Sequence, residues 1–193
     1  MVRTWAHIVR AREAILRATL QVVGEHGVAG STNRRIATVA GVSLGSLTYH
    51  FPEQQQLLRE TLLLFAEDEA RRVRDTALRY STANLDLEQA ATTVQHVLEQ
   101  LSFGNNEIAP LELYLHAGRN PGLRDATTRC FAAYDELAGT ILRALGTHDS
   151  DRLVEPVVAL LTGLQLRRLA TGTTSAAPTA EALTMLAYGA RQR

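Results

Sequence analysis

The apolar residues of the chain recur mainly at helical spacing, and no stretch alternates with the two-residue period of a strand. In a first helix, predicted over residues 3–26, Ile8, Ile15 and Val22 fall on one face, and Gly27 follows as its end. Later helices are predicted over residues 53–80, 86–102, 107–118, 121–145, 152–171 and 179–191. The pattern therefore predicts an all-α protein.

Between these long helices the sequence predicts two short ones. Thr32 is placed to cap a helix over residues 33–40, because its hydroxyl oxygen can accept from the free amides of the first turn. Gly41 then suits a left-handed turn, Ser43 is the next cap, and a helix over residues 44–50 follows. The total is about nine helices.

The spacing of Ala37, Gly41 and Leu47 fits a helix-turn-helix, since a small residue lets two helices cross closely and glycine allows the sharp turn. The first helix is expected to pack against Ile36, Val39 and Leu47. The second short helix then presents its other residues outward, toward a DNA major groove. These outward residues are Leu44, Gly45, Ser46, Thr48, Tyr49 and His50.

At these positions the chain resembles the DNA-binding domain of TetR-type bacterial repressors. The resemblance covers Ile36-Ala37, Ala40-Gly41-Val42-Ser43, Gly45, Leu47, Tyr49-His50-Phe51 and Leu57-Leu58. It implies a DNA-binding domain at residues 1–52 and a helical ligand-binding and dimerisation domain at residues 53–193. Many relatives carry lysine at the positions of Leu44 and Gln54 and tyrosine at that of Thr48, so the chain departs from the family pattern there.

The resemblance implies a ligand-responsive repressor that binds palindromic double-stranded operator DNA as a dimer, with the two heads ~34 Å apart. Ser46, Thr48 and Tyr49 are the expected readers of base edges. The full set of expected DNA contacts is Thr32, Arg34, Arg35, Ser43, Leu44, Gly45, Ser46, Thr48, Tyr49 and His50. One alternative is an effector-independent architectural or protein-partner factor on the same fold. Another is a helical binding or catalytic protein with a vestigial helix-turn-helix.

Charge is distributed in agreement with a DNA-binding amino-terminal region. The net charge of the chain is zero, but residues 1–60 hold seven arginines against four acids, a net +3. The single cysteine, Cys130, fits a reducing compartment and is expected to be a buried structural thiol. No signal peptide or membrane-spanning stretch is evident, which favours a cytoplasmic protein.

The sequence contains no pattern that predicts an enzyme. The six histidines are not paired at zinc-site spacing, and CxxC, phosphate-binding loops and nucleophile elbows are absent, so no cofactor or metal is expected. The acidic run Glu67-Asp68-Glu69 is interpreted as a solvated helix face.

Two further sites are predicted in the carboxy-terminal region. The segment from Leu153 to Leu169 is apolar on more than one face, so the helices near residues 121–145 and 152–171 are expected to form a homodimer interface. The alternative is a helix at the centre of its own domain. Pro156 marks either the first turn of that helix or a kink within it. A small-molecule effector pocket is predicted from His96, Gln100, Phe103, Tyr114, His116, Arg119 and Tyr134. The alternative for each residue taken singly is that the aromatic side chains belong to the core and the polar ones to the surface.

Overall fold

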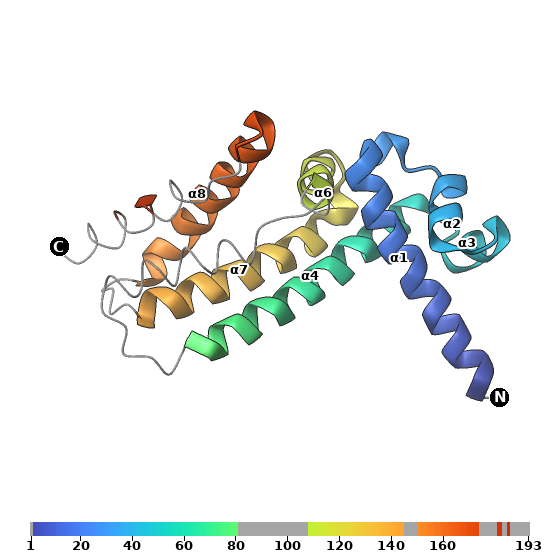
Figure 1. The fold of residues 1–193 in the computed structure, drawn as a ribbon, viewed down its shortest axis with the longest axis horizontal. Coiled ribbons are helices and arrows are strands. Elements are labelled where there is room, and N and C mark those ends of the chain that lie inside the picture. Colours follow the sequence, from blue (N-terminus) through green and yellow to red (C-terminus); the bar gives the residue numbers. More distant parts are fainter. Residues whose placement is uncertain (1, 81–107, 145–149, 174–180, 183–184, 186–193) are drawn as a thin grey trace. The chain divides into compact units, whose positions relative to one another are not determined.

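The structure is a computed structural model that describes residues 2–80, 108–144, 150–173, 181, 182 and 185. Across these residues all regular secondary structure is helical, which confirms the predicted fold class (Figure 1). The elements are α1 (Val2–Gly30), α2 (Asn33–Ala40), α3 (Leu44–His50), α4 (Gln54–Tyr80), α6 (Ile108–Arg119), the 3-10 helix η2 (Pro121–Leu123), α7 (Arg124–Ala144) and α8 (Ser150–Thr171).

The described part of the chain holds seven α-helices rather than the expected nine. The helix predicted over residues 86–102 lies outside the described residues, as does most of the one over residues 179–191. Bounds of α2 and α3 agree with the prediction. In α1 the backbone leaves helical geometry at Gly27 (φ 70°, ψ 170°), the predicted end, before a last turn reaches Gly30. Helix α8 starts at Ser150 and runs through Pro156, so the alternative that Pro156 marks the first turn of this helix is wrong.

The chain divides into two compact units, Met1–Asp68 with Gly104–Cys130 and Glu69–Phe103 with Phe131–Arg193. In the first unit, α1 packs against α2 and α3 through a core that includes Ile15, Val22, Ile36 and Leu47. Burial of these large apolar side chains is the main force that holds the short helices in place. The expectation that Val39 joins this core is wrong: Val39 is 41% exposed, because the buried face of α2 is centred on Ile36 and Ala37.

A second core of the same unit joins α1, the first part of α4, α6 and the start of α7. Its buried side chains include Leu62, Leu113 and Leu123, each fully buried. Cys130 belongs to this core with 1% exposure, and its thiol donates to the Leu62 carbonyl oxygen at 3.7 Å. The predicted burial of the cysteine is therefore confirmed.

In the second unit, α7 and α8 pack through Ala138, Leu142, Val157 and Val158. No helix within the described ranges is long and apolar enough to cross a membrane.

The acidic run in α4 is less solvated than expected. Glu67 is exposed, but Asp68 pairs with Arg17 at 3.0 Å. Glu69 is only 7% exposed and pairs with Arg72 at 2.6 Å. The prediction of a solvated helix face therefore fits Glu67 alone among the three residues. Asp68 pairs with Arg17 of α1, and Glu69 pairs with Arg72 in the next turn of α4.

Candidate nucleic-acid interface

Local hydrogen bonds set the ends of α2 and α3. Thr32 has extended backbone, and its hydroxyl oxygen accepts from the Arg35 amide at 3.4 Å. Ser43 does the same for α3, where its hydroxyl oxygen accepts from the Ser46 amide at 3.1 Å. Between the helices Gly41 is left-handed (φ 67°, ψ 29°), a conformation that costs glycine little. Ser43 is thus a cap as well as a predicted DNA contact.

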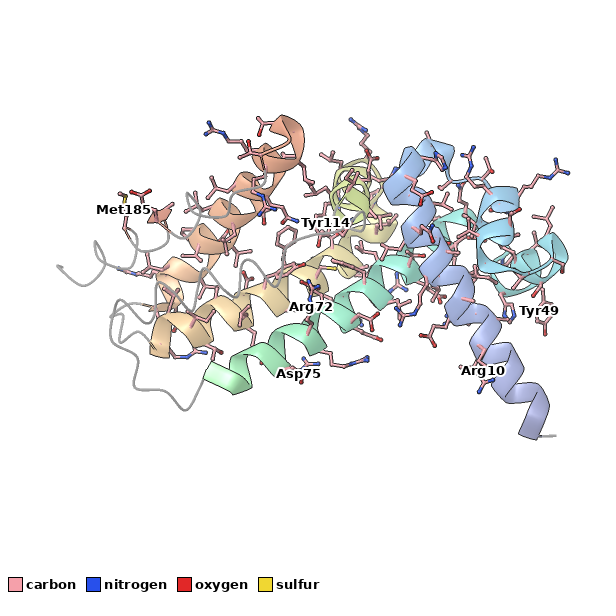
Figure 2. The ribbon with its side chains drawn as sticks, in the orientation of Figure 1. Arg10, Tyr49, Arg72, Asp75, Tyr114 and Met185 are labelled. Atoms are coloured by element: carbon pink, nitrogen blue, oxygen red, sulfur yellow. The ribbon has the colours of Figure 1, made fainter. Side chains whose placement is uncertain are left out.

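Helix α3 turns one side chain inward and most of the others outward. Leu47 is fully buried, whereas Leu44 is 46% exposed and Tyr49 is 79% exposed. Figure 2 labels the Tyr49 side chain. Thr48 and Gly45 are also exposed, and Ser46 and His50 are half-buried. An exposed tyrosine and leucine on a short helix leave apolar surface in water, which is common at surfaces that bind a partner.

No contact among the described residues requires glycine at position 45. Its φ is outside the left-handed region, and a Cβ added there would meet only the Ser43 hydroxyl oxygen, at an ordinary 3.9 Å. Alanine is more favourable than glycine inside a helix, so the fold itself favours a larger residue here. The absence of a side chain instead leaves room for another molecule to approach the backbone of α3.

The Thr48 hydroxyl is held against the backbone of its own helix. It donates within 3.1 Å of the Leu44 and Gly45 carbonyl oxygens. This fixes the side-chain rotamer and leaves the methyl group and the oxygen lone pairs for an external contact. Tyr49 and His50 lie edge to face, with ring centroids 5.4 Å apart.

The two arginines of α2 differ in their surroundings. Both side chains are exposed, but Arg35 donates from Nη1 to the Gly30 carbonyl oxygen at 2.6 Å. Arg35 therefore stabilises the turn between α1 and α2 through Nη1, and the other N–H groups of its guanidinium remain to bind an anion. This structural contact was not predicted from the sequence.

Arg12 and Gln54 also hold the helix-turn-helix of α2 and α3, here called the head, in place, and the sequence analysis did not predict this. The Arg12 guanidinium lies over the Phe51 ring, 5.3 Å from its centroid, and pairs with Glu60 of α4. Gln54 donates from Nε2 to the Ser31 carbonyl oxygen at 3.2 Å. All three contacts join residues far apart in the chain, so helical periodicity gives no signal for them.

The predicted pocket residues are only partly described. His96, Gln100 and Phe103 lie outside the described residues. On α6, Tyr114 packs against the second core of the first unit, His116 is half-buried and Arg119 is exposed. Tyr134, in the second unit, packs against the α7–α8 core.

Comparison with known proteins identifies both regions of the chain. Residues 15–61 match the family model described as "Bacterial regulatory proteins, tetR family". Residues 85–189, more than half of the chain, match the model described as "Tetracyclin repressor-like, C-terminal domain".

Individual relatives agree with these matches. The regulator PksA of Bacillus subtilis is 32% identical over 105 residues, which cover 54% of this chain and 48% of PksA. The regulator BetI of Agrobacterium fabrum is 29% identical over 167 residues, 81% of this chain and 75% of BetI. The structure of the multidrug binding protein EbrR in complex with ethidium superposes with a TM-score of 0.69 at 28% sequence identity. The superposition covers 92% of this chain and 98% of the EbrR chain. The chain therefore belongs to the tetR family of bacterial transcriptional regulators.

Proposed function

We propose that the chain is a homodimeric, ligand-responsive repressor whose α3 helix reads operator DNA in the major groove. The observation that carries this proposal is the outward surface of α3 around buried Leu47, with Gly45 open to close approach. Residues 1–52 act as the DNA-binding domain and residues 53–193 as the ligand-binding and dimerisation domain.

Roles within the DNA surface follow from side-chain chemistry. Ser46, Thr48 and Tyr49 contact base edges or thymine methyl groups, because a methyl and hydroxyl oxygens remain available on the outer face of α3. Phosphate contacts come from Thr32, the cap of α2, from Arg34 and Arg35 of α2, and from Tyr49 and His50 of α3. Leu44 and Gly45 lie closest to the start of α3, where a recognition helix approaches the base pairs.

The dimer forms through α7 and α8. In the chain by itself Leu166 of α8 is 53% exposed, although its helix also buries Val157 and Val158 against α7. A second copy that packs its own α7 and α8 there forms a two-fold four-helix bundle. Two heads then sit about one helical turn of DNA apart, ~34 Å.

A small molecule regulates the repressor. EbrR, a structural relative, is a multidrug binding protein solved with ethidium, and here Tyr114 and Tyr134 are aromatic candidates for an effector site together with His96, Gln100, Phe103, His116 and Arg119. Helix α4 runs without interruption from Gln54, beside the head, to Tyr80. A shift of α4 changes the head spacing, and a coupling free energy of about 1–3 kcal/mol is enough to regulate binding.

The first test is DNA selection from the source genome followed by binding measurements over a salt series. We expect operator affinity to fall roughly a hundredfold or more between about 50 and about 200 mM salt, because phosphate contacts release counterions. An affinity independent of salt contradicts the proposed DNA contacts. Titration of the DNA-free protein into ethidium, with the fluorescence of the dye as the signal, tests for an effector site. If a series of dyes all fail to bind, the effector-independent alternative is favoured.

The assigned roles are separated by substitutions at two positions, Arg34 and Thr48. Arg34→Ala should weaken binding to every sequence alike, about tenfold, because it removes a phosphate contact. Thr48→Ala should change the preference between operator variants, and Thr48→Val, which keeps a methyl group, should change it less. Arg34 is a cleaner test than Arg35, whose guanidinium also holds the Gly30 carbonyl. If Arg34→Ala and Thr48→Ala have equal effects on all sequences, these assignments are contradicted.

A further inference from the structure

Two side chains at the start of α4 reach the segment that joins α6 to the first residues of α7, here called the α6–α7 turn (residues 120–125). Gln55 donates from Nε2 to Asn120 Oδ1 at 2.7 Å. Arg59 donates from Nε to Asp125 Oδ1 at 3.1 Å, and its Nη2 pairs with Asp125 Oδ2. Gln55 and Arg59 are one helical turn apart and share a face of α4. Two contacts on adjacent turns fix both the position and the rotation of the helix.

The α6–α7 turn is shaped around the Gln55 side chain. A Cβ added at Gly122 would lie 2.1 Å from Gln55 Nε2 and 3.1 Å from its Cδ, so any larger residue displaces that side chain. The φ of Gly122 is outside the left-handed region, and its role is therefore steric. Leu123, fully buried in the second core, holds the turn, and its amide donates to the Asn120 carbonyl oxygen at 3.1 Å.

The residues next to Gln55 and Arg59 bind the DNA-binding head instead. Gln54 donates to the Ser31 carbonyl oxygen beside the Thr32 cap of α2. Glu60 pairs with Arg12, whose guanidinium lies over Phe51 at the end of α3. Consecutive residues of a helix point about 100° apart, so the first two turns of α4 hold the head on one side and the α6–α7 turn on another.

We propose that Gln55, Arg59, Asn120 and Asp125 are positioning residues for DNA binding, which fix the head to the α6–α7 turn through the start of α4. This inference rests on the proposed function, because it concerns the orientation of the reading helix. The side chains of Arg59 and Asp125 are 39% and 45% exposed, and exposed ion pairs contribute little to folding stability. Their loss should therefore change operator affinity more than it changes the melting temperature.

The decisive variant is Asp125→Asn in the full-length protein. It removes a negative charge, which by electrostatics alone strengthens DNA binding, yet it breaks the pair with Arg59. We expect operator affinity to fall about fivefold, with the melting temperature nearly unchanged. Glu67→Gln, an exposed acid of α4, is the matched charge control and should leave affinity equal or slightly higher. An Asp125→Asn variant that binds as Glu67→Gln does overturns the proposal.

Two further comparisons address the other contacts. Exchange of the charges in Arg59→Asp with Asp125→Arg should restore most of the affinity that Arg59→Asp alone loses. Gln55→Ala and Gly122→Ala should weaken binding by similar factors, and their combination should be no worse than either, because both remove the same hydrogen bond. Should Gly122→Ala fail to fold, Gln55→Ala with Asn120→Ala gives the same test. Additive losses contradict a shared contact.

A distance measurement decides the inference without DNA. Spin labels are attached at two exposed sites, Val39→Cys in α2 and Leu115→Cys in α6, in a Cys130→Ala background. The distance between the two labels reports the position of α2 relative to α6. Dilution with unlabelled chain restricts the measurement to distances within one chain. We expect a narrow distance distribution that broadens when Gln55→Ala and Asp125→Asn are combined. An unchanged distribution overturns the positioning role. If the wild type binds no operator, the proposed function fails, while this measurement still tests the contacts.

Discussion

Two fully buried threonines of the first unit differ in how their hydroxyls are satisfied. Thr19 of α1 donates to the Ile15 carbonyl oxygen at 2.8 Å, one turn earlier. Thr61 of α4 is 1% exposed, and its hydroxyl has no hydrogen-bond partner among the described residues. A buried polar group without a partner costs about 1–3 kcal/mol. Thr61 is therefore a site where the native sequence does not reach its highest stability.

We predict that Thr61→Val raises the free energy of unfolding by about 1 kcal/mol, because valine has nearly the same shape and carries no hydroxyl. Thr19→Val is the matched control and should gain less, since its hydroxyl already has an acceptor. Chemical denaturation of the two variants and the wild type measures both changes. Equal changes at the two sites would show that hydrogen bonding of the hydroxyl does not distinguish them.

The Asp125 carboxylate provides a prediction about pH. The hydrogen bond from Arg59 is the main cause that holds the pKa of Asp125 below its ordinary 3.8. A lowered pKa means that the ionised form is favoured by folding, so this stabilisation is present above the ordinary pKa and is lost as pH falls through the lower folded value. Carboxyl NMR titration should find the pKa of Asp125 below 3.8 in the wild type and closer to 3.8 in Arg59→Gln. An unchanged pKa in the variant would exclude Arg59 as the cause.

At the scale of elements, Gly41 lies in the turn between α2 and α3 and Gly45 lies in α3, and the two positions need glycine for different reasons. Gly41 is left-handed and has open space around it, so only its backbone conformation requires glycine. Gly45 is the second residue of α3, and it has helical backbone and room for a Cβ. The first residue thus serves the fold of the helix-turn-helix, whereas the second is explained by the proposed approach of DNA.

We predict that Gly45→Ala raises the melting temperature slightly, since alanine gains about 1 kcal/mol over glycine within a helix, and lowers operator affinity at least tenfold. Gly41→Ala should do the reverse for stability, with a loss of about 1–2 kcal/mol from the left-handed backbone. Thermal unfolding and binding to the selected operator measure both effects. A Gly45→Ala variant that binds the operator normally would contradict close approach of the duplex at this position.

Features of the fold and the site that depend on neighbouring residues could be predicted from the sequence, whereas those that depend on tertiary contacts could not. The bounds of α2 and α3 follow from Thr32, Ser43 and Gly41, whose effects reach only three or four residues. The Gln55–Asn120 and Arg59–Asp125 contacts join residues 65 and 66 positions apart, and no periodic pattern encodes them. For the same reason the outward residues of α3 were predictable, whereas the residues that hold α3 in place were not.

For the whole molecule, the surfaces left exposed on the chain indicate where a second copy is needed. Leu115 of α6 and Leu166 of α8 are 65% and 53% exposed, so the two leucines are alike in exposure. Only Leu166 belongs to a helix that is apolar on more than one side and that is proposed to lie in the dimer. A palindromic operator requires both heads on one duplex, so this interface and DNA affinity are linked.

We predict that Leu166→Arg raises the dimer dissociation constant at least tenfold, because it places a charge in an apolar interface without a partner. Leu115→Arg carries the same change in charge and should leave the dimer intact. Light scattering over a concentration series measures the assembly, and binding to full and half operators measures its consequence. Leu166→Arg should lose affinity for the full operator while its affinity for a half-site stays the same, since each head is unaltered. A stable dimer in this variant, or dissociation of the Leu115→Arg control, would place the interface elsewhere.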